Sequence, residues 1–321
     1  MERKTFLKIG LGLAFSEIAY MGAMFGLLFL LPKIVFDDFI PGIRSAVLNL
    51  IYTAALYIVM LFVLWVFVRS VPAAPKKPKQ KLSLKMFFAL MMICFGFGYL
   101  LALGGGFIDD LFKSLIRILF DRVYLFPEPG SYVAPDKTTV EFISSSIITV
   151  IYAPVFEELI FRKVLLDKLR PFGDVTAILF TGFAFGLTHM NFGQFFFATA
   201  VGFVFGYVMI KTNRLIYPIL MHFAYNSFSA FVFPFMKWVD KKIGLVVAML
   251  VLSGFLYSMM VIGPSVFFTN LKKIKLDRPE YRFSRPLGGK MIFLNAGTII
   301  YLVVISLVFV YVALTNALIG A

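Results

Sequence analysis

Two adjacent carboxylates, Glu157 and Glu158, interrupt an otherwise apolar stretch that ends at Arg162. Ionised groups inside a bilayer are costly, so a pair of them in such a stretch points to a function. The chain contains two histidines, His189 and His222, and both also lie in hydrophobic segments. A carboxylate that accepts a proton and an imidazole that assists it are the groups that activate water for hydrolysis.

Helical spacing gives these side chains different surroundings. Residues four apart share a helix face, so Glu158 pairs with Arg162, while Glu157 points about 100° away. We therefore expect Glu158 to play a supporting role and Glu157 to be the general base. The same spacing places His222 and Asn226 on one face, where both can donate hydrogen bonds to an oxyanion. Two alternatives stay open: a charged juxtamembrane helix end for the carboxylates, and interhelical hydrogen bonds for the others.

The elements that must position these residues are membrane helices. Hydrophobic residues make up 60% of the 321-residue chain, and the mean hydropathy is +0.91. A helical crossing of the hydrocarbon core needs about 20 apolar residues. The sequence therefore predicts an all-α, polytopic membrane protein of eight to nine transmembrane helices, forming a single domain over residues 1–321. The apolar runs span 9–31, 46–68, 86–108, 140–170, 174–190, 194–211, 215–235, 243–266 and 291–318.

The net charge of +14 reflects short Lys and Arg tracts between the apolar runs. Membrane topology explains this distribution better than nucleic-acid binding, so the expected surroundings are a lipid bilayer and no nucleic acid. With the N-terminus in the cytoplasm, 22 of the 31 basic residues fall on the cytoplasmic side. The chain is therefore expected to be a multipass protein of the cell membrane, with the N-terminus inside and the C-terminus outside. The single cysteine, Cys94, has no partner for an intrachain disulfide.

Several connecting segments carry expectations of their own. The proline-rich, basic segment 72–81 is expected to be a solvated loop, and 109–126 an interfacial helix. A continuous helix over 140–170, followed by an antiparallel helix over 174–190, would bring Glu157 and His189 to similar depth. Four glycines at small-xxx-small spacing predict close packing of the helices around His189: Gly182, Gly186, Gly202 and Gly206.

Three spaced motifs carry a resemblance to a known family. Glu157-Glu158-x-x-x-Arg162, Phe185-x-x-x-His189 and His222-x-x-x-Asn226 resemble, in this order, the motifs of the CAAX-protease and bacteriocin-processing (CPBP, or Abi) intramembrane proteases. The resemblance covers about residues 140–235, which would form the catalytic core.

The resemblance implies a cytoplasm-facing protease of a prokaryotic membrane. Its substrate would be a membrane-associated protein or peptide, of the CAAX type or the leader or bacteriocin type. Glu157 and His189 would activate water, and His222 and Asn226 would stabilise the transition state. Glu158 and Arg162 would support them.

Other interpretations remain open. A zinc ion could be the cofactor, with Glu157, His189 and His222 as ligands. The metal-free mechanism is favoured because Asn226 is a poor zinc ligand and a good hydrogen-bond donor. Two non-proteolytic functions compete: a non-catalytic membrane regulator or scaffold of the same family, and a transporter with Glu17, Glu157 and His189 as a proton relay.

Overall fold

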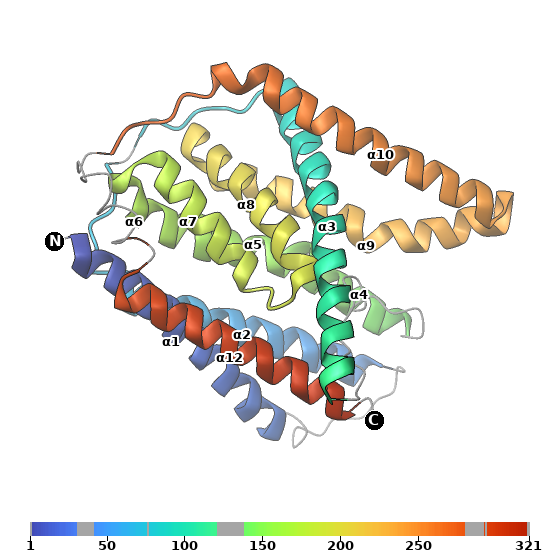
Figure 1. The fold of residues 1–321 in the computed structure, drawn as a ribbon, viewed down its shortest axis with the longest axis horizontal. Helices are drawn as coiled ribbons and strands as arrows, with labels where there is room; N and C mark the ends of the chain where they lie inside the picture. Colours follow the sequence, from blue (N-terminus) through green and yellow to red (C-terminus); the bar gives the residue numbers. More distant parts are fainter. Residues whose placement is uncertain are drawn as a thin grey trace.

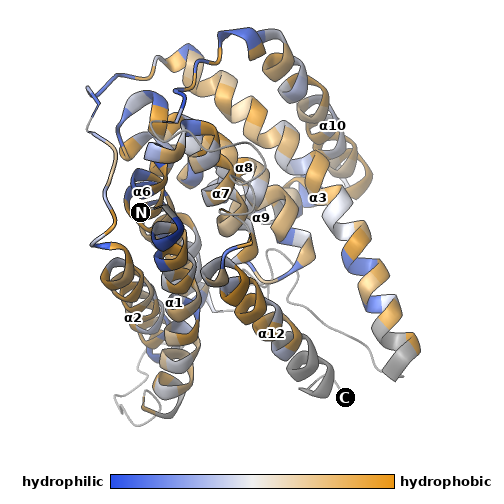
Figure 2. Cartoon of the chain, turned by 60° about the vertical axis from the view of Figure 1, so that its left-hand side comes forward, coloured by the Kyte–Doolittle hydropathy of each residue, from blue (hydrophilic) through white to orange (hydrophobic). Residues whose placement is uncertain are grey.

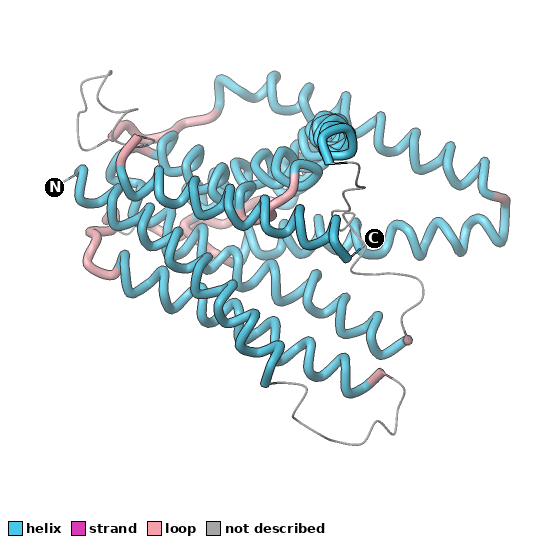
Figure 3. The backbone as a smooth tube through the Cα atoms, turned by 60° about the horizontal axis from the view of Figure 1, so that its bottom comes forward, coloured by secondary structure: helices cyan, strands magenta, loops and turns pink. Residues whose placement is uncertain are grey.

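The structure, a computed structural model, describes residues 2–30, 42–75, 77–120, 138–279, 292 and 294–319. These residues form helices and connecting loops and contain no β-strand, as Figure 3 shows. The expected all-α, polytopic architecture is confirmed.

Helices form at every apolar run that the sequence predicts. The longer ones are α1 (Glu2–Leu30), α2 (Ile43–Val68), α3 (Leu84–Phe120), α7 (Asp174–Leu187), α8 (Phe192–Thr212), α9 (Ile216–Ile243), α10 (Leu245–Asn270) and α12 (Ala296–Ile319). Between α3 and α7, the helix Thr139–Phe172 runs without a gap but changes its hydrogen-bond register, and it is called the broken helical segment for that reason. It consists of α4 (Thr139–Ile147), η3 (Ile148–Tyr152), α5 (Ala153–Glu158), η4 (Leu159–Leu166), α6 (Asp167–Leu169) and η5 (Arg170–Phe172). A short η6 (Leu271–Lys273) follows α10.

The number of possible membrane crossings lies near the predicted range. Within the described residues, six helices are long and apolar enough to cross, or seven if the bent pair Ile216–Val232 and Pro234–Lys242 forms one span. Two shorter apolar helices, Asp174–Leu187 and Ala296–Tyr311, complete the set. With 14 residues, α7 is about 21 Å long, so it is shorter than the hydrocarbon core of roughly 30 Å.

Two expected boundaries are wrong. Residues 109–120 do not begin a separate interfacial helix, because they continue α3, which runs unbroken for 37 residues; residues 121–126 lie outside the described residues. The expected helix over 174–190 ends at Leu187, so His189 lies in a turn and not on a helix.

The helices pack in two groups around the broken segment. In Figure 1, α1 lies beside α2 and α12, while α7 and α8 lie together in the middle of the molecule. α3 crosses α8 and also contacts α10, which turns back on α9 as a hairpin at the right of the view. One core cluster joins α1 and α2 to the broken segment, α7 and α8, and a second joins α3, α8 and α9.

Small residues permit the close approach of α7 and α8. A Cβ atom added at Gly202 would lie 3.0 Å from Gly182 Cα, and one added at Gly186 would lie 2.0 Å from Thr199 Oγ1. The expected glycine packing is therefore present. α1 and α12 approach in the same way, because a Cβ atom at Gly10 would lie 2.1 Å from the carbonyl carbon of Gly297.

Several connections are joined to one another at one end of the bundle. The backbone N–H of Ala74 donates to the Asp167 carbonyl, and that of Gln80 donates to the Thr212 carbonyl. Lys77 pairs with Asp277, whose backbone N–H donates to the Asp174 carboxylate at 2.9 Å. The described residues of the segment 72–81 form a loop and are mostly exposed, as expected, and these bonds tie the loop to Asp167, Thr212 and Asp277. Figure 2 shows hydrophilic residues mostly at helix ends and connections, with apolar residues along the helices.

Candidate active site

The two glutamates lie between two π-helical segments and not on a continuous α-helix. In η3, the N–H of Ala153 donates to the Ile148 carbonyl, five residues back. In the same register, residue 154 would donate to the Thr149 carbonyl. Residue 154 is a proline without an N–H, so the Thr149 carbonyl has no backbone donor there. Single π-helical turns inside α-helices occur frequently at functional sites. The expected continuous helix over 140–170 forms within the helix Thr139–Phe172, but its hydrogen-bond register changes at the two π-helical segments, which the sequence did not predict.

Glu158 and Arg162 form the buried ion pair that their spacing predicts. Glu158 Oε1 lies 3.1 Å from Arg162 Nη1, and both side chains are 0% exposed. Arg162 Nη2 also donates to the Gly202 carbonyl at 3.2 Å, which links the broken segment to α8. The guanidinium carbon lies 4.6 Å from the ring centre of Phe185 and 5.5 Å from that of Phe205. Aromatic faces stabilise a desolvated guanidinium, so these two rings help to hold the buried cation.

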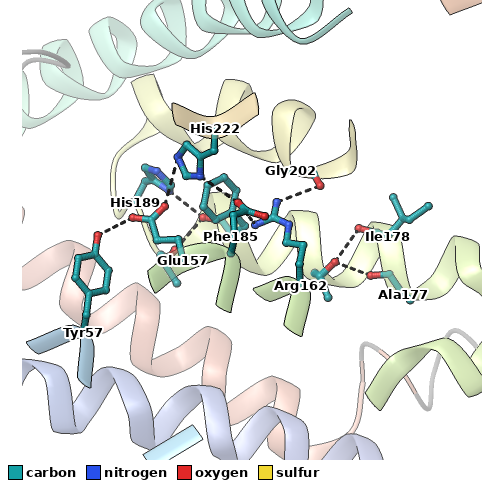
Figure 4. A network of polar contacts seen from close by, with 12 residues as sticks. Tyr57, Glu157, Arg162, Ala177, Ile178, Phe185, His189, Gly202 and His222 are labelled. Atoms are coloured by element: carbon teal, nitrogen blue, oxygen red, sulfur yellow. Dashed lines mark hydrogen bonds and ion pairs between the residues drawn. The ribbon is translucent and has the colours of Figure 1, made fainter. Parts of the chain in front are cut away.

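His222 lies between the two carboxylates, a contact that the spacing did not predict. Its Nδ1 lies 3.0 Å from Glu158 Oε1, and its Nε2 lies 3.8 Å from Glu157 Oε2. A carboxylate accepts hydrogen bonds, so we assign a hydrogen to Nδ1, which donates to Glu158. Nε2 is the nitrogen that faces Glu157, as Figure 4 shows.

Glu157 is less enclosed than its neighbour. Its side chain is 17% exposed, and no Lys or Arg nitrogen lies within ion-pair distance among the described residues. Its Oε1 accepts a hydrogen bond of 2.7 Å from the Tyr57 hydroxyl, which comes from α2. Sequence reasoning missed Tyr57, since nothing in a pattern on α2 indicates a contact with a residue 100 positions later.

His189 reaches the site from the turn between α7 and α8. Its Nδ1 lies 2.8 Å from the Phe185 carbonyl, which can only accept, so Nδ1 donates and Nε2 is an acceptor. Met190 has a φ of 54°, and the Asn191 side chain both caps α8 and donates to the His189 carbonyl. Figure 4 shows the His189 and His222 rings near the Glu157 carboxylate, and both rings meet Phe185 edge-on.

Asn226 bonds to the backbone of the helix that carries the glutamates and, among the described residues, forms no hydrogen bond with Glu157, His189 or His222. It lies one turn beyond His222 on α9, and its Nδ2 donates to the Thr149 carbonyl at 2.8 Å. This is the carbonyl that Pro154 leaves without a backbone donor. An amide nitrogen carries two hydrogens, so one remains for another acceptor.

Two alternative arrangements do not form in this structure. Among the described residues, no three His, Cys, Asp or Glu side chains are grouped so as to hold a metal ion, so Glu157, His189 and His222 do not fit a zinc site as placed. Glu17 is buried on α1, its Oε1 has no partner, and within the described ranges no hydrogen bond connects it to Glu157 or His189.

Comparisons with known proteins bear on the same segment. Residues 139–228 match the family described as type II CAAX prenyl endopeptidase Rce1-like. The chain is 33% identical over 86 residues to the putative membrane peptidase YdiL of Bacillus subtilis (strain 168). The aligned region covers 26% of this chain and 34% of YdiL. It is 25% identical over 130 residues to the membrane-embedded CAAX protease MroQ of Staphylococcus aureus (strain USA300). That aligned region covers 37% of this chain and 51% of MroQ.

The chain thus spans about a third of the length of YdiL and about half of the length of MroQ. No solved structure matches it significantly. The match over residues 139–228 includes all seven residues of the three motifs. That segment of this multipass membrane protein is therefore Rce1-like, and the resemblance read from its three motifs is confirmed at the level of the family.

Proposed function

We propose that this chain is an intramembrane endopeptidase that hydrolyses a peptide bond with water activated by Glu157. The observation that supports this most is the difference between the two carboxylates. Glu158 is fully enclosed beside Arg162, whereas Glu157 keeps 17% exposure and turns Oε2 towards His222. A carboxylate that water can reach, without a Lys or Arg partner in the described structure, is suited to accept a proton.

In the proposed reaction, Glu157 takes a proton from a water molecule while the water oxygen attacks the scissile carbonyl carbon. His189 orients this water through Nε2, which is an acceptor because Nδ1 donates to the Phe185 carbonyl. The oxyanion accepts hydrogen bonds from the second amide hydrogen of Asn226, and from Nε2 of His222 when both ring nitrogens carry hydrogen. The C–N bond then breaks, and the proton on Glu157 passes to the leaving amine.

The substrate we propose is a membrane-associated protein or peptide, either CAAX-type or leader- or bacteriocin-type. The family description and the printed name of MroQ favour the first class, and both curated relatives are named as membrane peptidases or proteases. We further propose that the N-terminus is cytoplasmic, that the site faces that side, and that residues 1–321 form one membrane domain around a catalytic core over 140–235.

A comparison of protein termini in cells tests the proposal. Membranes from cells with the wild type are compared with membranes from cells with Glu157→Gln, whose side-chain oxygen can still accept from Tyr57. Asp240→Asn is the matched control, because it removes an exposed acid from α9 away from the site. We expect termini that are present with the wild type and Asp240→Asn and absent with Glu157→Gln.

Purified protein in lipid nanodiscs then gives direct kinetics. The probes are two internally quenched peptides, one farnesylated with a C-terminal CAAX sequence and one unprenylated and leucine-rich. Hydrolysis by the wild type that is lost in Glu157→Gln supports the proposal. Identical termini in cells, together with no hydrolysis of either probe, would instead favour the non-catalytic regulator.

A further inference from the structure

Among the described residues outside the Rce1-like segment, Tyr57 is the one that forms a hydrogen bond with the Glu157 carboxylate. It lies on α2, and its hydroxyl donates to Glu157 Oε1 at 2.7 Å. The matched segment begins only at residue 139. Figure 4 shows the Tyr57 side chain reaching the carboxylate from the side opposite the two histidines.

The Tyr57 ring is fixed against the residue that precedes the glutamate. It stacks on Phe156 with ring centres 5.1 Å apart and an angle of 3° between the planes. Phe156 is held in turn by an edge contact with Tyr152, at 6.1 Å and 82°. The hydroxyl is therefore set relative to the same turn of backbone that carries Glu157.

The helix that carries Tyr57 is itself firmly anchored. Leu56, Met60 and Leu64 of α2 are buried, and the last two belong to the core cluster that includes the broken helical segment. A hydrogen-bond donor on such a helix has little freedom to follow a carboxylate that moves. The carboxylate is instead held where the hydroxyl lies.

The two oxygens of Glu157 therefore have different partners. Oε1 is occupied by Tyr57, and Oε2 lies 3.8 Å from His222 Nε2 on a side chain that is 17% exposed. We propose that Tyr57 is a positioning residue for the general base, holding Oε1 so that Oε2 is the oxygen that accepts the proton. This inference rests on the proposed function, because it names a further residue of the same hydrolytic site.

Tyr57→Phe tests the proposal, because it removes the hydroxyl and keeps the ring that stacks on Phe156. Loss of a hydrogen bond that orients a charged group is expected to lower kcat by about tenfold to a hundredfold. KM for the quenched peptide that the wild type cleaves should stay unchanged, and so should the melting temperature. Tyr52→Phe is the matched control, since the Tyr52 hydroxyl on the same helix has no hydrogen-bond partner among the described residues.

The outcomes separate this inference from the function itself. A lower kcat in Tyr57→Phe alone, with KM and melting temperature unchanged, supports the positioning role. Full kcat in Tyr57→Phe, in a preparation where Glu157→Gln is inactive, overturns the role of Tyr57 and leaves the proposed function standing. A change in KM or melting temperature that accounts for the whole effect would make Tyr57 a structural residue only. Full hydrolysis by Glu157→Gln would overturn both proposals.

Discussion

Neighbouring carboxylates in this chain have surroundings that suit them to different tasks. Glu158 Oε1 lies 3.1 Å from Arg162 and 3.0 Å from His222, in a place without exposed surface. A buried ion pair contributes little net stability, but removal of one partner leaves an uncompensated charge and is strongly destabilising. We therefore expect Glu158 to have a structural task, which is to hold His222 and Arg162 in place.

Removal of Arg162 should show this dependence. Arg162→Met is expected to lower the free energy of unfolding by roughly 3–5 kcal/mol, because it leaves the Glu158 charge buried without its cation. The double variant Glu158→Gln/Arg162→Met should lose less unfolding free energy than Arg162→Met alone, because it leaves no buried charge without a partner. Denaturant unfolding in mild detergent measures both. Equal losses in the single and double variants would show that the charge of Glu158 is compensated elsewhere.

The placement of the histidines leads to a prediction about metal. Each imidazole donates from Nδ1, to Phe185 or to Glu158, and the remaining nitrogens do not join Glu157 in a metal-binding group within the described structure. Hydrolysis of the quenched peptide should therefore be unchanged after treatment with a chelator. Elemental analysis of the active protein accompanies the assay. Stoichiometric zinc, with activity lost to the chelator and restored by added metal, would establish the zinc mechanism instead.

At the scale of single residues, sequence spacing predicts contacts within one helix and misses those between helices. The Glu158–Arg162 pair and the shared face of His222 and Asn226 follow from i,i+4 geometry. The contacts of Tyr57 with Glu157 and of His222 with Glu158 join residues 100 and 64 positions apart. Such contacts depend on how helices cross, and a single sequence contains no direct signal of it.

At the scale of elements, the change of hydrogen-bond register in the helix that carries the glutamates is the main feature that periodicity missed. Proline removes a hydrogen-bond donor and clashes with the preceding turn of a regular α-helix. The π-helical register before Pro154 accommodates it and leaves the Thr149 carbonyl to Asn226 of α9. The proline itself is visible in the sequence, but the partner that compensates for it is not.

Pro154 and Asn226 should therefore be coupled in stability. Asn226→Ala leaves the Thr149 carbonyl unpaired, which is expected to cost about 1–3 kcal/mol of unfolding free energy. In a Pro154→Ala background, the restored N–H of residue 154 can pair with Thr149, so the same substitution should cost less. Chemical denaturation of the four proteins of this cycle gives the coupling. Additive losses would mean that Asn226 does not replace the missing backbone donor.

Close packing of α7 and α8 leads to a second prediction at this scale. Gly202→Ala would place a methyl group 3.0 Å from Gly182 Cα and 3.2 Å from Arg162 Nη2, so we expect a loss of about 1–3 kcal/mol in stability. Gly254→Ala on α10 is the matched control, because its Cβ atom would meet nothing within 4 Å. There, the better helix propensity of alanine should be neutral or slightly stabilising. Thermal unfolding of both variants decides whether the crossing is as tight as described.

At the scale of the whole molecule, the connections expected on the cytoplasmic side meet at one end of the bundle. The Lys8 ammonium donates to Ser70, and residues 74–80 bond to the connections that contain Asp167, Thr212 and Asp277. The hydrogen bond from Lys77 also holds the pKa of Asp277 below its usual value. At the other end, Ser45 donates to Glu141 at 2.6 Å. Hydropathy and charge thus predict which connections share an end.

The orientation of that end in the membrane is the last prediction. Arg162 lies in the site and not in a loop, but the excess of basic residues on the side of the N-terminus remains large without it. We therefore expect this side to be cytoplasmic.

Single cysteines at the exposed positions Lys79, Lys242 and Lys273 test this orientation with a membrane-impermeant thiol reagent on intact cells. Cys94 can stay in place, because its side chain is buried and the otherwise unaltered protein serves as the control. Lys242→Cys, next to the turn between α9 and α10, should be labelled from outside, and Lys79→Cys and Lys273→Cys only after permeabilisation. Labelling of Lys79→Cys or Lys273→Cys in intact cells would place this end, and the opening of the site proposed for it, on the outer side.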